Sequence, residues 1–290
     1  DDGMDFFAAQ QVWQPLLAQC VREDADGKLG CAQEVPEYQR RAWICNFYRL
    51  QPPRLSHLVS LHNETINIWT HLAGAIFFAV RGSIWALGRW SFYEQPLPAV
   101  LMGMLAISSF ACMSASAAFH CRSCANLQEF DCSLCMDRTC ILALISVSFI
   151  IGITFGFTCS PNLMHGYLLM TLVMLVVIAL PFTVPVLSKY RSDSLKIAVL
   201  GLIPAFHFLF AVPSKLAILK PGMICMVIGY IGGLVFLVSF VPERWAPGRY
   251  DLIGQSHQIW HVCVFLAAAA WMETMLRAFN LMHADPALCQ

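Results

Sequence analysis

The sequence predicts an all-α membrane protein, a bundle of seven transmembrane helices. Of its 290 residues, 58% are hydrophobic and 12% are charged, whereas about 25% of a soluble domain is charged. Stretches without Asp, Glu, Lys or Arg recur along the chain, and a transmembrane helix needs about 20 such apolar residues. These two observations exclude ordinary soluble, disordered and collagen-like proteins. With 18 basic and 18 acidic residues the net charge is zero, so no nucleic-acid partner is expected.

The first 60 residues differ in composition from the rest. They carry eight of the 18 acidic residues of the chain: Asp1, Asp2, Asp5, Glu23, Asp24, Asp26, Glu34 and Glu37. No basic-then-apolar segment precedes them, so a cleaved secretory signal is not expected. We expect a polar cytosolic leader over 1–60, a seven-helix domain over 61–280 and a short C-terminal tail over 281–290.

The charge-free windows place the spans one by one. The window 139–188 is long enough for two helices, which are separated at the turn-like residues 159–162. The first span includes Arg81, which must snorkel, pair or face the bundle interior. Runs such as 168–177 show no alternation of apolar and polar residues, which excludes a barrel. The predicted spans are 66–88, 97–121, 137–158, 164–187, 196–212, 222–241 and 257–277.

The distribution of Lys and Arg near the span ends predicts the orientation, because cytosolic loops are richer in both. With a cytosolic N-terminus, the cytosolic flanks hold eight basic residues: Arg49, Arg54, Arg122, Lys189, Arg191, Lys196, Arg244 and Arg249. The opposite flanks hold four: Arg89, Lys215, Lys220 and Arg277. The excess favours a cytosolic N-terminus in a multi-pass protein of the plasma membrane or an endomembrane.

Two histidines at the start of the seventh span are the first candidate metal ligands. His257 and His261 are four residues apart, so they share one face of a helix. Two imidazoles on one turn are a common half-site for zinc. The alternative is a pair of interfacial histidines that snorkel toward the membrane surface.

Three further polar residues are expected at the same depth. Ser116 and His120 share a face near the end of the second span, and Asp137 opens the third. With seven spans, these positions lie near the same membrane face as His257 and His261. Three histidines with one open position form a known catalytic zinc set. We therefore expect His120, His257 and His261 to bind Zn²⁺. Asp137 would orient the zinc-bound water or accept its proton, and Ser116 would form a hydrogen bond nearby or help to hold a reacting carbonyl. The alternative for Asp137 is a favourable contact with the helix N-terminus.

Other residues of metal-ligating type are less specific. Cys121-x-x-Cys124 and Cys132-x-x-Cys135 resemble a zinc ribbon, but only seven residues separate the two pairs. Reduced thiols or S-palmitoylation at the membrane surface are the alternatives. His71 has no partner at metal-ligand spacing and is expected to make an interhelical contact.

The stretch from His62 to Leu72, HNETINIWTHL, resembles the opening motif of the progestin and adipoQ receptor family. The Ser116-x-x-x-His120 pair, Asp137 seventeen residues after His120, and Ser256-His257-x-x-x-His261 are similar to the zinc motif of that family. The pattern is also similar, at the superfamily level, to alkaline ceramidases and haemolysin-III-like proteins.

The resemblance implies seven helices with a cytosolic N-terminus, a topology inverted relative to G-protein-coupled receptors. It implies a zinc bound by His120, His257 and His261, with Asp137 hydrogen-bonded to the zinc water. It also implies an adiponectin or steroid receptor, and similarity to ceramidases in activity. The expected partners are a membrane lipid, such as ceramide or a fatty acid, and an extracellular hormone or steroid.

Three functions are compatible with these features. The first is a zinc-dependent hydrolase of ceramide-like lipid amides, coupled to signalling. The second is a receptor whose zinc is purely structural, and the third is a membrane scaffold or trafficking protein without hydrolase activity.

Overall fold

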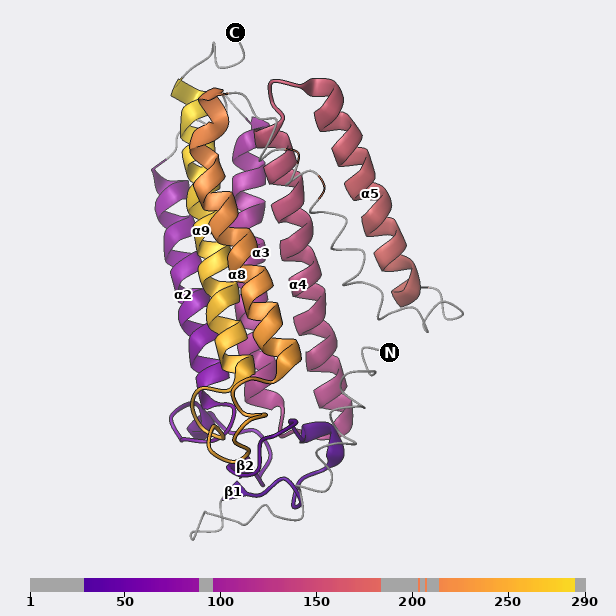
Figure 1. The fold of residues 1–290 in the computed structure, drawn as a ribbon, viewed down its shortest axis with the longest axis vertical. Helices are drawn as coiled ribbons and strands as arrows, with labels where there is room; N and C mark the ends of the chain where they lie inside the picture. Colours follow the sequence, from indigo (N-terminus) through magenta and orange to yellow (C-terminus); the bar gives the residue numbers. More distant parts are fainter. Residues whose placement is uncertain (1–28, 89–95, 184–202, 204–206, 208–213, 285–290) are drawn as a thin grey trace.

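The structure is a computed structural model that describes residues 29–88, 96–183, 203, 207 and 214–284. Within these residues it contains six α-helices and one two-stranded sheet. Figure 1 shows that the other helices run side by side along the long axis, whereas α5 leans away from them. The helices are α2 (Thr65–Leu87), α3 (Pro96–Arg122), α4 (Leu127–Gly156), α5 (Pro161–Thr183), α8 (Lys220–Ser239) and α9 (Ser256–Ala284).

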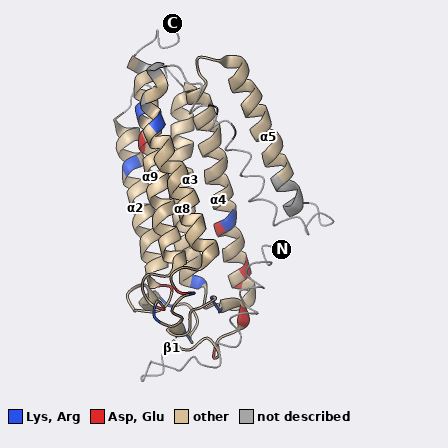
Figure 2. Ribbon diagram, viewed as in Figure 1, with Lys and Arg blue, Asp and Glu red and all other residues tan. Residues whose placement is uncertain are grey.

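Five helices are long and apolar enough to cross a membrane: α2, α3, α4, α8 and α9. The described apolar stretch of α5, Pro161–Val177, is shorter. Each of these six helices overlaps a span predicted from the charge-free windows. Apart from 203 and 207, the predicted span 196–212 lies outside the described residues. Figure 2 shows that long parts of the helices carry no charged residue, as expected for lipid-facing surfaces.

The core lies between α2, α3, α4 and α9, and large apolar side chains fill it. Among the most deeply buried are Phe78, Met113, Ile151, Phe155 and Phe279. Large apolar residues also face outward, for example Ile76, Ile107 and Leu266. A helix that is apolar on all sides belongs in lipid or in a large core, so the outward faces agree with the composition.

The start of α4 corrects the predicted boundary of the third span. The sequence predicts a helix from 137, with Asp137 at its N-terminus, but α4 begins ten residues earlier. Asn126 caps it, because its side chain accepts a hydrogen bond from the backbone N–H of Glu129 at 3.0 Å. Asp137 therefore lies within the helix, and interaction with the free N–H groups of a helix end does not explain it.

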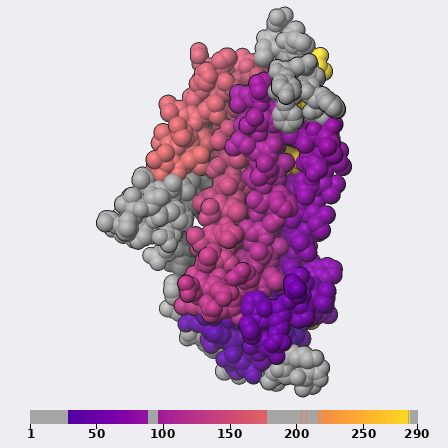
Figure 3. Space-filling view, turned by 180° about the vertical axis from the view of Figure 1, so that it is seen from behind, coloured from indigo at the N-terminus to yellow at the C-terminus, as the bar shows by residue number. Residues whose placement is uncertain are grey.

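The N-terminal segment, which we define as residues 29–50, folds over one end of the bundle. Its strands β1 (Leu29–Gly30) and β2 (Tyr48–Arg49) pair in antiparallel register, with Gly30 opposite Tyr48. In Figure 3 this indigo part of the chain covers the lower end of the magenta helices. We call this the capped end of the bundle. Apolar residues form a small separate core within the segment: Ala32, Val35, Ala42, Trp43, Ile44 and Tyr48.

Two buried polar side chains fasten the segment to the helices. Arg49, which is 4% exposed, donates to the carbonyl oxygens of His120 and Cys121 at 2.7 and 2.8 Å. These carbonyls belong to the last turn of α3, where a cation is favoured by the helix dipole. Asp251, in the loop between α8 and α9, accepts from the backbone N–H groups of Cys45 and Asn46 at 3.1 and 2.7 Å.

Arg81, the charged residue inside the first predicted span, has a partner on the last helix. Its Nε and NH2 atoms donate to the two carboxylate oxygens of Glu273 on α9, at 2.5 and 2.9 Å. A bidentate pair of this kind neutralises both charges and fixes their geometry. The pair joins α2 to α9 far from the capped end.

Candidate metal centre

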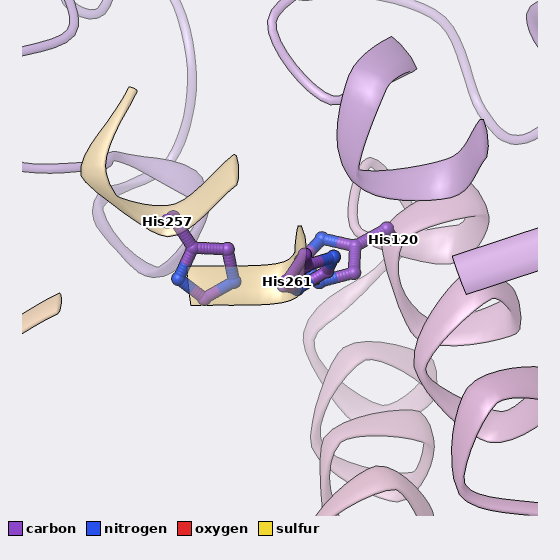
Figure 4. A group of neighbouring side chains, drawn as sticks. All are labelled: His120, His257 and His261. Atoms are coloured by element: carbon purple, nitrogen blue, oxygen red, sulfur yellow. The ribbon is translucent and has the colours of Figure 1, made fainter. Parts of the chain in front are cut away.

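Three histidine side chains converge where α3 ends and α9 begins. His120 comes from α3, and His257 and His261 come from the first two turns of α9 (Figure 4). One ring nitrogen from each lies within 4.8 Å of the others. Among the described residues, no other group of three or more His, Cys, Asp or Glu side chains has this geometry. The structure thus brings together the three residues that the sequence predicts as metal ligands.

Two of these rings face each other through their Nε2 atoms. His120 Nε2 and His261 Nε2 are 3.1 Å apart, and the two side chains are 1% and 2% exposed. His257 is partly exposed, and its ring centroid lies 5.2 Å from that of His120 and 4.7 Å from that of His261. The trio is therefore buried on one side and open on the other.

The opposite nitrogens of the two buried rings have acceptors on α2 or just before it. His120 Nδ1 lies 2.8 Å from the carboxylate oxygen Oε2 of Glu64, the residue that precedes α2. His261 Nδ1 lies 3.2 Å from the backbone carbonyl oxygen of Asn67. A carboxylate and a carbonyl can only accept, so these two contacts favour a hydrogen on each Nδ1, which leaves a lone pair on each Nε2.

Glu64 is held from several sides although it is only 3% exposed. The Nε of Arg41 donates to Oε1, and the side-chain amide of Asn67 donates to Oε2 at 2.6 Å. Burial by itself would raise the pKa of the Glu64 carboxyl, but Arg41 and His120 hold that pKa well below its usual value. The carboxylate is therefore charged and remains an acceptor.

This arrangement fits a zinc ion. Two imidazole lone pairs that face each other at 3.1 Å repel unless a cation lies between them. Zinc binds imidazole nitrogens at about 2.0–2.1 Å, and tetrahedral geometry then separates two such nitrogens by about 3.3 Å. Hydrogen bonds from the second nitrogens to a carboxylate or a carbonyl are the usual support of zinc-binding histidines.

The structure places Asp137 and Ser116 beside each other, next to the trio but outside it. The Ser116 side chain, on α3, interacts with the Asp137 carboxyl on α4. Ser116 lies one turn from His120, about 6 Å along the helix axis. Asp137 is 8% exposed, and its Oδ1 atom is one of the buried atoms without a hydrogen-bond partner in the described part of the chain.

The four cysteines of the predicted ribbon are not brought together. Cys121 lies in the last turn of α3 and Cys124 in the turn after that helix, while Cys132 and Cys135 are exposed near the start of α4. All four are free thiols. No group of the described residues combines them into a metal site.

The sequence analysis missed Glu64, Arg41 and the location of His71. The His71 ring stacks on His261, with centroids 3.7 Å apart and planes 9° apart. Glu64, Asn67 and His71 follow one another at spacings of three and four, which place them on one helical face. This spacing within the HNETINIWTHL stretch could have predicted that the three polar side chains lie on the same side of α2 and face one site.

Comparison with known proteins adds a family. Residues 59–272 match the family model described as haemolysin-III related. The chain is 29% identical to the adiponectin receptor protein of Drosophila melanogaster, over 82% of this chain and 61% of that protein. It is 31% identical to heptahelical transmembrane protein 1 of Arabidopsis thaliana, over 81% and 76% of the two chains.

A mouse relative is matched over almost its whole length. The chain is 25% identical to progestin and adipoQ receptor family member 3 of Mus musculus, over 95% of this chain and 92% of that protein. By contrast, the chain spans only about three-fifths of the length of the fly protein.

Proposed function

The chain belongs to the haemolysin-III-related family and, within it, to the progestin and adipoQ receptors. On that premise we propose that it is a zinc-dependent hydrolase of ceramide-like lipid amides, coupled to signalling. It is a multi-pass helical membrane protein. The observation that carries the proposal is the convergence of His120, His257 and His261, whose ring nitrogens lie within 4.8 Å of one another.

The proposal includes seven spans and a cytosolic N-terminus. Six helices are described, and the predicted span 196–212 supplies the seventh. The plant relative is named heptahelical, which supports this number. The excess of Lys and Arg supports a cytosolic location for the N-terminal segment, and with it for the capped end. The topology is then inverted relative to G-protein-coupled receptors.

Each residue of the site has a role. His120, His257 and His261 would hold the zinc, with Glu64 and the Asn67 carbonyl behind two of them. When bound, zinc would act as a Lewis acid and lower the pKa of its bound water to about 7. Asp137 would accept a proton from the attacking water and return it to the leaving amide nitrogen, and Ser116 would orient that carboxylate.

The location of the trio favours a lipid substrate. It lies at the ends of helices that are long enough to span a bilayer, so an amide near the level of lipid headgroups can reach it. Addition of water to the amide releases a fatty acid and a sphingoid base. The names of the fly and mouse relatives also support a hormone or steroid as a second, extracellular partner.

The test measures zinc per chain and ceramide hydrolysis on the same purified protein. We expect close to one zinc per chain in the wild type and close to none in His120→Ala, with hydrolysis lost together with the metal. His165→Ala on the exposed side of α5 is the matched control, because His165 is remote in sequence and outside the trio. Zinc retained in His120→Ala, or hydrolysis unchanged in His257→Ala, would contradict the proposal.

A receptor with a purely structural zinc is the second candidate. It is favoured by the fact that the trio joins α3 to α9, while Glu64 ties the start of α2 to the same place. A metal there would fix three helices without any chemistry. Full zinc occupancy without turnover of any ceramide would support this candidate over the hydrolase.

A further inference from the structure

The Nδ1 atom of His120 has two neighbours of opposite charge. The carboxylate oxygen Oε2 of Glu64 lies 2.8 Å from it, and the guanidinium NH2 of Arg41 lies 3.2 Å from it. Only one of them can form a hydrogen bond to Nδ1 at a time. A protonated Nδ1 donates to Glu64, whereas a bare Nδ1 accepts from Arg41.

The two choices have opposite consequences at the other side of the ring. If Nδ1 carries the hydrogen, Nε2 presents a lone pair to His261, 3.1 Å away. If Nδ1 accepts from Arg41, the neutral ring carries its hydrogen on Nε2 and cannot bind a metal there. The neighbour that forms the hydrogen bond with Nδ1 therefore decides whether His120 can bind a metal through Nε2.

The contacts favour Glu64. Both neighbours are charged, so either hydrogen bond would be charge-assisted, but the Glu64 oxygen lies 2.8 Å from Nδ1 and the Arg41 nitrogen 3.2 Å. Arg41 is also engaged elsewhere, because its Nε donates to the other carboxylate oxygen of Glu64. Asn67 fixes Oε2 from a third direction at 2.6 Å. The carboxylate is thus held in the orientation that selects the metal-binding tautomer.

We propose that Glu64 is a positioning residue that keeps His120 in the Nδ1–H tautomer, and that Arg41 of the N-terminal segment holds Glu64 in place for this purpose. The inference rests on the proposed zinc site. For His261 the corresponding acceptor is the backbone carbonyl oxygen of Asn67, 3.2 Å from its Nδ1, and the Thr70 hydroxyl lies 3.4 Å from the same nitrogen. The start of α2 and the N-terminal segment therefore belong to the site as much as α3 and α9 do.

The first measurement is the zinc Kd of the full chain in lipid nanodiscs, by competition with a chelating dye. Loss of such a carboxylate partner weakens zinc binding by about 10–100-fold, and we expect a change of this size in Glu64→Gln. Glu273→Gln is the matched control: it is the same isosteric change, made in the carboxylate that pairs with Arg81. Its zinc Kd should equal that of the wild type.

The second measurement reports the tautomer itself in zinc-free protein. The ¹⁵N NMR spectrum of histidine-labelled protein distinguishes Nδ1–H from Nε2–H rings, and His120→Asn identifies the signals of His120. We expect Nδ1–H in the wild type and in Glu273→Gln, and a shift toward Nε2–H in Glu64→Gln. A purely structural effect of the substitution would not exchange one tautomer for the other.

The outcomes separate this inference from the proposed function. Zinc bound equally well by the wild type and by Glu64→Gln, with His120 unchanged in its tautomer, would overturn the inference and leave the proposed function intact. Absence of zinc from the wild type would overturn the proposed function, and the role of Glu64 in zinc binding with it.

Discussion

At the scale of single residues, two polar side chains near the site have buried atoms without hydrogen-bond partners. The Asp137 Oδ1 atom and both ring nitrogens of His71 have no hydrogen-bond partner in the described part of the chain. An unsatisfied buried polar atom costs about 1–3 kcal/mol, so such atoms are rare unless a ligand or water meets them. Both residues lie beside the trio, His71 by stacking on His261. Each therefore offers a hydrogen-bonding atom to a molecule bound beside the trio.

The first prediction concerns Asp137. Because Asp137 is outside the group of ligand atoms, Asp137→Asn should keep its zinc. It should lose ceramide hydrolysis by roughly 100-fold or more, since an amide cannot accept the proton. Zinc content and turnover are measured on the same preparation. Asp131→Asn, on an exposed face of the same helix, should be unaffected, and full turnover in Asp137→Asn would favour the structural zinc.

At the scale of elements, α8 and α9 approach each other through glycines. A Cβ added to Gly229 would lie 2.9 Å from the Cβ of Ala267, and one added to Gly233 would lie 2.7 Å from the Cβ of Cys263. Small residues four apart allow helix backbones to pack closely in lipid. Gly232, between them in sequence, has open space beside it.

The second prediction uses this contrast. Gly233→Ala should destabilise the protein by about 1–3 kcal/mol, because the added methyl overpacks the interface. Gly232→Ala makes the same chemical change on the same helix and should leave Tm unchanged or slightly raised. Thermal unfolding in detergent measures both. Equal Tm values for the two variants would show that the close packing of α8 on α9 does not carry this stability.

The helices also show what the sequence can predict and where it fails. Charge-free windows locate the described spans because lipid excludes charge, but they miss parts of helices that extend beyond the membrane. α4 has 30 residues, which is about 45 Å and longer than the hydrocarbon core of about 30 Å. Its first turns therefore carry Glu129, Asp131 and Arg138, which ended the window. Asn126 followed three residues later by Glu129 is a sequence pattern typical of a helix N-terminus, and it could have predicted where α4 begins.

The reliance on charge-free windows and short spacings also explains which residues of the site could be predicted from the sequence. His257 and His261 are recognised by their spacing alone, and His120 by its depth. Glu64 was not predicted as a site residue, because its charge places it just outside the first charge-free window. It nevertheless contacts His120 at 2.8 Å. Arg41 lies 79 residues from His120 in sequence, and no periodicity relates the two. Only the fold of the N-terminal segment brings Arg41 to the site.

At the scale of the whole molecule, the proposed metal links helices from both ends of the chain. A ligand that binds only the folded state stabilises it, by about 2.7 kcal/mol at a concentration 100 times its Kd. The third prediction is that a chelator lowers the Tm of the wild type and that added zinc restores it. The Tm of His120→Ala should be the same with and without the chelator. A wild-type Tm that does not respond to chelation would contradict a stabilising metal.

The fourth prediction concerns orientation. Cys121, Cys124, Cys132 and Cys135, near the capped end, are free thiols, whereas Cys159, after α4 at the other end, is disulfide-bonded. Disulfides persist in oxidising compartments, which agrees with a cytosolic capped end. A membrane-impermeant maleimide should label Cys132 and Cys135 only after cells are permeabilised. Loss of that signal in a variant with Cys132→Ser and Cys135→Ser identifies it, and labelling of Cys132 or Cys135 on intact cells would reverse the orientation.

The pairing of Arg81 with Glu273 has a consequence for biosynthesis. These residues are 192 positions apart, and His120 and His261 are 141 apart. A ribosome releases α2 and α3 into the membrane long before α9 exists, so during translation Arg81 and His120 have no partner on α9. The nascent protein must tolerate an unpaired charge and an incomplete site until its last helix emerges. Synthesis of α9 then completes the ion pair and the site together, and a chain truncated before α9 keeps Arg81 without its Glu273 partner.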